Sequence, residues 1–198
     1  KEKRLRSPSY NSKRHLIAAI NTVDGLSNIF ISDADSINFT KLTDFNNQEY
    51  ISTISWDTNG NKLYADVILN HGRDIYVIDL DSKNISISID NYDDCRNPIH
   101  YDGKTYFSTD YNGIFNIAFK DTSGVKFLTN VTGGAFMPEL LDDKLVFSLY
   151  SNGGYKIAMI DNFKPIDTEH IGYKNTEYFE PSNIQIPNHM SYTDSSTE

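Results

Sequence analysis

The chain has 198 residues, of which 38% are hydrophobic, 13% aromatic and 23% charged. This composition excludes a disordered chain, and no run reaches the roughly 18 consecutive apolar residues that a transmembrane helix needs. The single cysteine, Cys95, excludes an internal disulfide framework and a multi-cysteine metal site.

The charge is distributed unevenly along the chain. Six basic residues and one acid lie in the first 14 positions, whereas the whole chain has a net charge of −9. An acidic body repels phosphates, so we expect no nucleic acid partner. The basic start is interpreted as a solvated end, with contact to an anionic partner or membrane surface as the alternative. Because the chain begins at Lys1 rather than Met, we expect a processed product or a fragment.

Four similar units are predicted to follow one another, over about 7–50, 51–93, 94–134 and 135–161. Each unit has a turn that ends in lysine, followed by a short apolar stretch. These lysines are spaced by 49, 42 and 40 residues and are Lys13, Lys62, Lys104 and Lys144. The stretches after them, such as Leu145-Val146-Phe147, predict strands.

A glycine turn comes next in each unit and predicts a hairpin. The four turns are Asp24-Gly25, His71-Gly72, Asn112-Gly113 and Asn152-Gly153. Asp-Gly and Asn-Gly suit two-residue hairpins, because both central residues need a positive φ. A second strand then begins around an isoleucine, in order Ile29, Ile75, Ile117 and Ile157. A further strand often ends in Leu-Thr, at Leu42-Thr43 and Leu128-Thr129.

The repeat predicts an all-β fold. Each unit supplies three or four short antiparallel strands, which cannot bury both of their faces without neighbours. Radial stacking of such units at about 40–50 residues each gives a β-propeller of four-stranded blades. The propeller region is expected to cover 1–161. Residues 162–198 read as a linker or tail with at most one extra strand, around Tyr178-Phe179 or Ile184-Gln185-Ile186.

The residues of the fourth unit resemble the TolB-type propeller repeat. Pro138, Phe147-Ser148 and the run from Asn152 to Ile157 follow its order, and Asn97-Pro98 through Ile117 matches nearly as well. The resemblance covers roughly 7–161 and implies architecture more than function. The same repeat occurs in periplasmic TolB, in propellers of prolyl-oligopeptidase-like and tricorn-like peptidases, and in propellers fused to outer-membrane barrels.

The number of units departs from that family. TolB-type propellers usually have six or more blades, whereas we count about four, so the chain is expected to form a partial ring. Additional blades would then come from the same gene product or from another chain. Two further departures are the missing Leu-Thr pair in the second unit and Asp142-Asp143 in place of the usual Asp-Gly.

The motifs of common enzymes are missing from the sequence. There is no Gly-x-Ser-x-Gly elbow, no His-x-x-x-His spacing and no glycine-rich phosphate loop. We therefore expect no catalytic residues, no metal and no cofactor. Cys95 lies beside Asp93 and Asp94, which argues against a reactive thiolate. Trp56 is interpreted as a packing residue between blades.

Two acidic segments have some of the features of calcium loops. Residues 79–84 have oxygen ligands at alternate positions but lack the glycine and the distant glutamate of an EF-hand. A hairpin turn is the preferred interpretation there, and a solvated loop is preferred for residues 90–94.

Aromatic and amide side chains in the loops of the third and fourth units are the candidate binding residues: Tyr111, Asn112, Tyr150 and Asn152. Such residues on a rigid scaffold suit recognition, and the alternative is that the tyrosines wedge between blades.

The leading hypothesis is a non-enzymatic propeller that binds or scaffolds proteins in the cell envelope. The resemblance implies a periplasmic or extracellular place, with outer-membrane association as a further option. The alternative is the substrate-gating propeller of a prolyl-oligopeptidase-like or tricorn-like peptidase whose catalytic domain lies elsewhere. Composition and the missing motifs favour the first hypothesis over the second.

Overall fold

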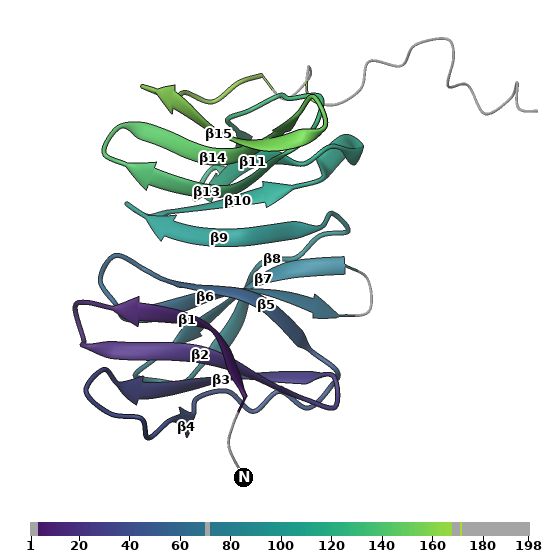
Figure 1. The fold of residues 1–198 in the computed structure, drawn as a ribbon. Helices are drawn as coiled ribbons and strands as arrows, with labels where there is room; N and C mark the ends of the chain where they lie inside the picture. Colours follow the sequence, from purple (N-terminus) through teal and green to yellow (C-terminus); the bar gives the residue numbers. More distant parts are fainter. Residues whose placement is uncertain (1–3, 70–71, 168–170, 172–198) are drawn as a thin grey trace, which may run out of the picture.

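The computed structural model describes residues 4–69, 72–167 and 171. These residues form four antiparallel sheets and a single short 3-10 turn, and the described part of the chain has no α-helix. Within each sheet, strands that follow one another in sequence are hydrogen-bonded neighbours. Figure 1 shows the sheets one after another, with the first at one end of the molecule and the fourth at the other.

The strands are short and fall into one sheet for each sequence repeat. The first sheet consists of β1 (Leu5–Asn11), β2 (Leu16–Val23), β3 (Leu26–Asp33) and β4 (Thr40–Lys41). The second consists of β5 (Tyr50–Trp56), β6 (Lys62–Leu69), β7 (Gly72–Asp79) and β8 (Ile85–Ile89). The third consists of β9 (Cys95–Tyr101), β10 (Lys104–Thr109), β11 (Asn116–Asp121) and β12 (Gly124–Phe127). The fourth consists of β13 (Ala135–Leu141), β14 (Lys144–Ser151) and β15 (Gly154–Asp161).

The first strands of the sheets line the inside of the arrangement. β1 contacts β5, β5 contacts β9, and β9 contacts β13, while the later strands of each sheet lie progressively farther out. This order is that of propeller blades around a common axis. The predicted all-β propeller with about four blades is therefore confirmed, except that the described part of the fourth blade has three strands.

The predicted glycine hairpins are confirmed in two blades. Val23 pairs with Leu26 and Ser151 pairs with Gly154, which leaves two-residue turns. Both residues of each turn have a positive φ, at 53° and 84° for Asp24-Gly25 and at 51° and 76° for Asn152-Gly153. These values fit the type I′ turn that matches the twist of paired strands.

The two-residue hairpin predicted at Asn112-Gly113 is wrong. Thr109 pairs with Asn116, so six residues connect β10 to β11. The 3-10 turn Tyr111–Gly113 lies in this loop, and the Gly113 amide donates to the Asp110 carbonyl at 2.6 Å. The loop is longer because Asp110 is also held from outside: its carboxylate accepts the Asp94 amide at 2.6 Å. Tyr111 in this loop packs against Phe127 of β12.

The prolines of the repeat lie at irregularities of the innermost strands. The pairing register shifts within β1, β9 and β13, and in each strand the residue before a proline has a φ near +50°: Ser7, Asn97 and Met137. Left-handed backbone next to proline is costly, so the surrounding sheet must hold these bulges in place.

One buried carboxylate holds the irregularity of β9 together with a register shift in β5, between Ile51 and Ile54. Asp66 of β6 is fully buried and accepts three hydrogen bonds, from the amide of Thr53 at 2.6 Å, from its hydroxyl at 2.9 Å and from the amide of Asn97 at 3.0 Å. Because Asn97 belongs to the third blade, the side chain joins the inner strands of two blades.

Three of the four predicted isoleucines lie at contacts between blades. Ile29, Ile75 and Ile117 have no exposed surface, and each packs on the blade that follows it. Each meets a cross-strand pair of an alanine and an aromatic residue, in order Ala65 with Tyr76, Ala118 with Phe107, and Ala158 with Phe147. Trp56 packs at the first of these interfaces and donates its indole N–H to the Ser9 carbonyl at 3.0 Å, as predicted for a residue between blades.

The chain after β15 returns toward the third blade. The Ile166 amide donates to the Phe127 carbonyl at 2.9 Å, and Ile171 packs in the cluster between the second and third blades. The expected extra strand around Tyr178 or Ile184 lies outside the described residues. The division into a propeller over 1–161 and a tail over 162–198 stays a prediction.

Candidate functional site

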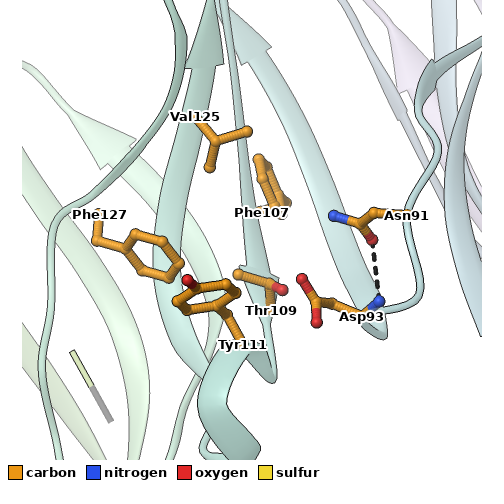
Figure 2. A pocket seen from close by; sticks show the side chains of 7 residues that line it. All are labelled: Asn91, Asp93, Phe107, Thr109, Tyr111, Val125 and Phe127. Atoms are coloured by element: carbon orange, nitrogen blue, oxygen red, sulfur yellow. Dashed lines mark hydrogen bonds between the residues drawn. The ribbon is translucent and has the colours of Figure 1, made fainter. Parts of the chain in front are cut away.

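A cavity of about 280 Å³ lies beside the third blade (Figure 2). Four apolar or aromatic side chains and three polar ones line it: Phe107, Tyr111, Val125, Phe127, Asn91, Asp93 and Thr109. Of the four binding residues predicted from sequence, Tyr111 belongs to this cavity. The cavity is thus the place where a predicted residue meets others that sequence analysis did not select.

Besides the turn that carries Tyr111, three segments build the cavity. Phe107 and Thr109 come from β10, Val125 and Phe127 from β12, and Asn91 and Asp93 from the loop between β8 and β9. Phe107 and Phe127 are nearly fully buried, whereas Tyr111 and Val125 are about 40% exposed and form the rim. The rings of Tyr111 and Phe127 lie 5.4 Å apart at 44°. The floor is therefore rigid and the mouth open to solvent.

The polar side chains of the cavity differ in hydrogen-bonding capacity: the Asp93 carboxylate only accepts, whereas the Thr109 hydroxyl and the Asn91 amide can both donate and accept. The Asn91 side-chain oxygen accepts the Asp93 amide at 3.1 Å and lies 3.6 Å from the Cys95 sulfur. The Asp93 carboxylate turns toward Thr109 and Tyr111 (Figure 2). Burial raises the pKa of Asp93, and the nearby Asp110 carboxylate raises it further.

Cys95 lies behind the cavity wall and is buried. Burial, with smaller contributions from Asp93 and Asp74, raises the pKa of this thiol to about 12. The thiol is therefore protonated at neutral pH, and the prediction that Cys95 is not a reactive thiolate is confirmed.

The other predicted binding residues do not join Tyr111. Tyr150 lies near the end of β14, where its ring meets that of Tyr155 at 5.1 Å, and Asn152 forms the next turn. Nothing is described for the side chain of Asn112. Whether any of these side chains binds a partner stays a prediction.

A second hollow of about 400 Å³ lies where the inner strands β5, β9 and β13 approach one another. Two arginines, Arg73 and Arg96, line it together with Tyr155 and Phe136. Both guanidinium groups approach the Asp94 carboxylate, Arg73 at 3.3 Å, and Arg96 also lies 4.5 Å from the centre of the Phe115 ring. Sequence analysis missed these residues, because no motif marks two arginines that sit 23 positions apart on different blades.

The face of β15 that points away from the third blade is apolar and open. Tyr155, Ile157 and Met159 alternate along this face, and all three are more than half exposed. Ile157 is 88% exposed, whereas its counterparts Ile29, Ile75 and Ile117 are all at 0%. Within the described residues, the fourth blade lacks the neighbour that covers the other three.

Two arrangements suggestive of metal binding have ordinary explanations. In the predicted turn over residues 79–84, an Asp79 oxygen accepts the amide and the hydroxyl of Ser82 at 2.9 and 2.8 Å. In the exposed group of His15, Asp33 and Asp35, the two nitrogens of the His15 ring are hydrogen-bonded with the Tyr10 hydroxyl at 3.0 Å and the Asp35 carboxylate at 3.1 Å. Neither arrangement holds an oxygen or nitrogen cluster that only an ion would explain.

None of the described helical segments is long and apolar enough to cross a membrane.

Comparison with known proteins gave a likeness of fold. No family model matches the sequence, and no curated protein matches it. Among solved structures, TolB from Acinetobacter baumannii superposes with a TM-score of 0.65 at 19% identity, over 80% of this chain and 41% of that one. A TolB-related structure from Agrobacterium tumefaciens gives 0.70 at 19% identity, over 81% and 64%.

Peptidase propellers are similar to about the same degree. Prolyl oligopeptidase B from Galerina marginata gives a TM-score of 0.64 at 11% identity, over 85% of this chain and 28% of that one. At these identities the likeness concerns the fold alone, which is a TolB-like β-propeller of about four blades. The chain spans less than two thirds of the length of either TolB structure.

Proposed function

We propose that this propeller is a non-enzymatic module that binds or scaffolds proteins in the cell envelope. The observation that carries the proposal is the open apolar face of β15, with Ile157 at 88% exposure. The envelope location rests on the resemblance to TolB-type repeats. The proposed partner is a protein whether the module binds it or scaffolds it.

An apolar face of this kind favours a protein occupant. Tyr155, Ile157 and Met159 stand in line on one strand, and patches of contiguous exposed apolar side chains mark interaction surfaces in soluble proteins. The same positions in the earlier blades are covered by the next blade. A sheet from additional blades, belonging to the same gene product or another chain, is therefore the occupant that best matches the surface.

The alternative function is the substrate-gating propeller of a peptidase. The likeness to puromycin hydrolase, with a TM-score of 0.65 at 9% identity, and to prolyl oligopeptidase B favours this reading. In the part of the chain that the structure describes, the histidine rings donate to or accept from Tyr10, Asp35 and Thr105, and no serine hydroxyl joins them. A catalytic domain elsewhere would have to supply the chemistry.

Site-specific photocrosslinking in the source cells tests the proposal. A photoreactive phenylalanine analogue at Tyr155 should form covalent adducts with a polypeptide, identified by mass spectrometry. The same analogue at the exposed Thr122, in the turn between β11 and β12, is the matched control and should give few adducts. Adducts that map to a peptidase domain would favour the alternative, and equal, weak labelling at both positions would contradict protein binding at this face.

A further inference from the structure

The Asp93 carboxylate is turned into the cavity of Figure 2 without a protein partner. Its oxygens face Thr109 and Tyr111, and no hydrogen bond or ion pair to them is found within residues 4–69, 72–167 and 171. A carboxylate only accepts hydrogen bonds, so a partly buried one calls for a donor or a cation. None of the seven lining residues is basic.

A second acceptor beside Asp93 is the buried hydroxyl of Thr109, on the same wall of the cavity. The Asn91 side-chain oxygen already accepts the Asp93 amide at 3.1 Å, and its nitrogen is turned toward the cavity (Figure 2). The Asp110 carboxylate is close enough to raise the pKa of Asp93, although it already accepts the Asp94 amide. Arg73 and Arg96 are engaged with Asp94 and line the other hollow.

The remaining walls suit an aliphatic stem that ends in a positive charge. Phe107, Phe127 and Val125 supply apolar surface, and the exposed Tyr111 ring stands at the mouth beside Phe127. Aromatic faces attract cations, by about 0.5–2 kcal/mol depending on solvation. The net charge of −9 also favours the approach of a cation over an anion.

We propose that this cavity is a binding site for a primary ammonium group on a short aliphatic stem, as carried by a lysine side chain or a free alkylamine. The ammonium donates its N–H groups to the Asp93 carboxylate and the Thr109 hydroxyl, and the stem packs on the phenylalanines. This site lies on the third blade, so it goes beyond the function proposed from the open face of β15.

Calorimetric titration of the purified chain tests the site with defined probes. The probes are N-acetyl-lysine methylamide, n-butylamine, and N-acetyl-norleucine methylamide, which has the stem without the charge. The lysine derivative should bind at least tenfold more tightly than the norleucine derivative. If the lysine derivative binds more tightly than butylamine, the site is assigned to a polypeptide partner. The reverse order assigns it to a small amine.

Variants at two aspartates separate the site from general charge. Asp93→Asn should weaken the binding of the lysine derivative at least tenfold, whereas Asp143→Asn, an exposed residue of the fourth blade, should change it less than twofold. In NMR spectra of the wild type, the backbone amide signals that shift on titration with the lysine derivative should centre on Tyr111 and Phe127. Equal binding of the norleucine derivative, unchanged binding by Asp93→Asn, or no heat at millimolar probe would each overturn the proposal. Asparagine is close in shape to aspartate, so the Asp93→Asn variant should fold normally. Its melting curve checks that it does.

Discussion

The third and fourth blades follow the same repeat but end differently. In the third blade, Asn116 begins β11 and its buried side-chain oxygen accepts the Thr129 hydroxyl at 3.0 Å and the Val131 amide at 2.9 Å. The Thr129 hydroxyl in turn accepts the Ile117 amide at 2.8 Å. In the fourth blade the matching residue is Lys156, whose side chain contains no hydrogen-bond acceptor atom. Within the described residues, no fourth strand lies beside β15.

The first blade repeats the bonds of the third. The Asn28 oxygen accepts the Thr43 hydroxyl at 3.0 Å and the Phe45 amide at 2.7 Å, and the Thr43 hydroxyl accepts the Ile29 amide at 2.9 Å. The asparagine before the interblade isoleucine thus fixes the Leu-Thr segment that follows the outermost strand. In the first and third blades this asparagine therefore helps to close the blade edge, and the fourth blade has a lysine in its place.

The largest expected effect concerns the interblade isoleucines. Ile117→Ala should destabilise the protein by about 3 kcal/mol, because it leaves a cavity between packed blades, whereas Ile157→Ala should cost less than about 0.5 kcal/mol. Urea unfolding of both variants measures the difference. Equal losses would mean that Ile157 is covered in solution.

The asparagine bonds should come next. Asn116→Ala should cost about 2 kcal/mol, because a buried threonine hydroxyl and an amide lose their acceptor, and Lys156→Ala should be nearly neutral. Hydrogen exchange of the Val131 amide provides a local readout, which should accelerate only in Asn116→Ala. Unchanged protection would show that the segment is held by its other contacts.

The glycines that follow the second strand of the third and the fourth blade should show a smaller effect. Gly113 and Gly153 have φ values of 82° and 76°, and a Cβ at either position meets no atom within 4 Å. Valine should therefore cost about 1–2 kcal/mol at both, from backbone strain alone. Melting temperatures check this, with alanine as the milder control. A wild-type melting curve for both valine variants would refute the strain.

The smallest expected effect is the pH dependence of the stability that Asp121 contributes. This residue ends β11, the third strand of the third blade. Hydrogen bonds from Ser123, with a contribution from Lys126, lower the pKa of Asp121 to about 2. Because the folded state favours the ionised form, this stabilisation is complete above the unfolded pKa near 4 and is lost as the pH falls through about 2. Asp121→Asn should lower the melting temperature at pH 6 and have little effect at pH 2. A pH-independent difference would contradict this assignment.

Local sequence signals predicted the strands and most of their turns. Asp24-Gly25 and Asn152-Gly153 gave correct hairpins because the positive φ values that they favour are set by two residues and no distant contact. The Asn112-Gly113 prediction was wrong because Asp110 is also bonded to Asp94, 16 residues away. The Leu-Thr pairs are visible in the sequence as a pattern. Only the structure shows that their threonines donate hydrogen bonds to Asn28 and Asn116.

The candidate sites were the least predictable part. Tyr111 was predicted to bind as a loop aromatic. Asp93, Phe107 and Phe127 were not predicted as binding residues, because they meet Tyr111 only when β10, β12 and the loop before β9 come together in the folded third blade. Lys156 was readable in the sequence as a departure from Asn28 and Asn116. The consequence of this lysine cannot be read from the sequence, because the hydrogen bonds that the asparagine makes in the other blades are tertiary contacts.

The sequence by itself determined that modules of antiparallel strands repeat along this protein, because alternation and turn residues act over a few neighbouring positions. The tertiary structure alone decided which faces are covered and where cavities form. The same isoleucine is buried in one module and exposed in another, because burial depends on the neighbouring blade and not on the residue.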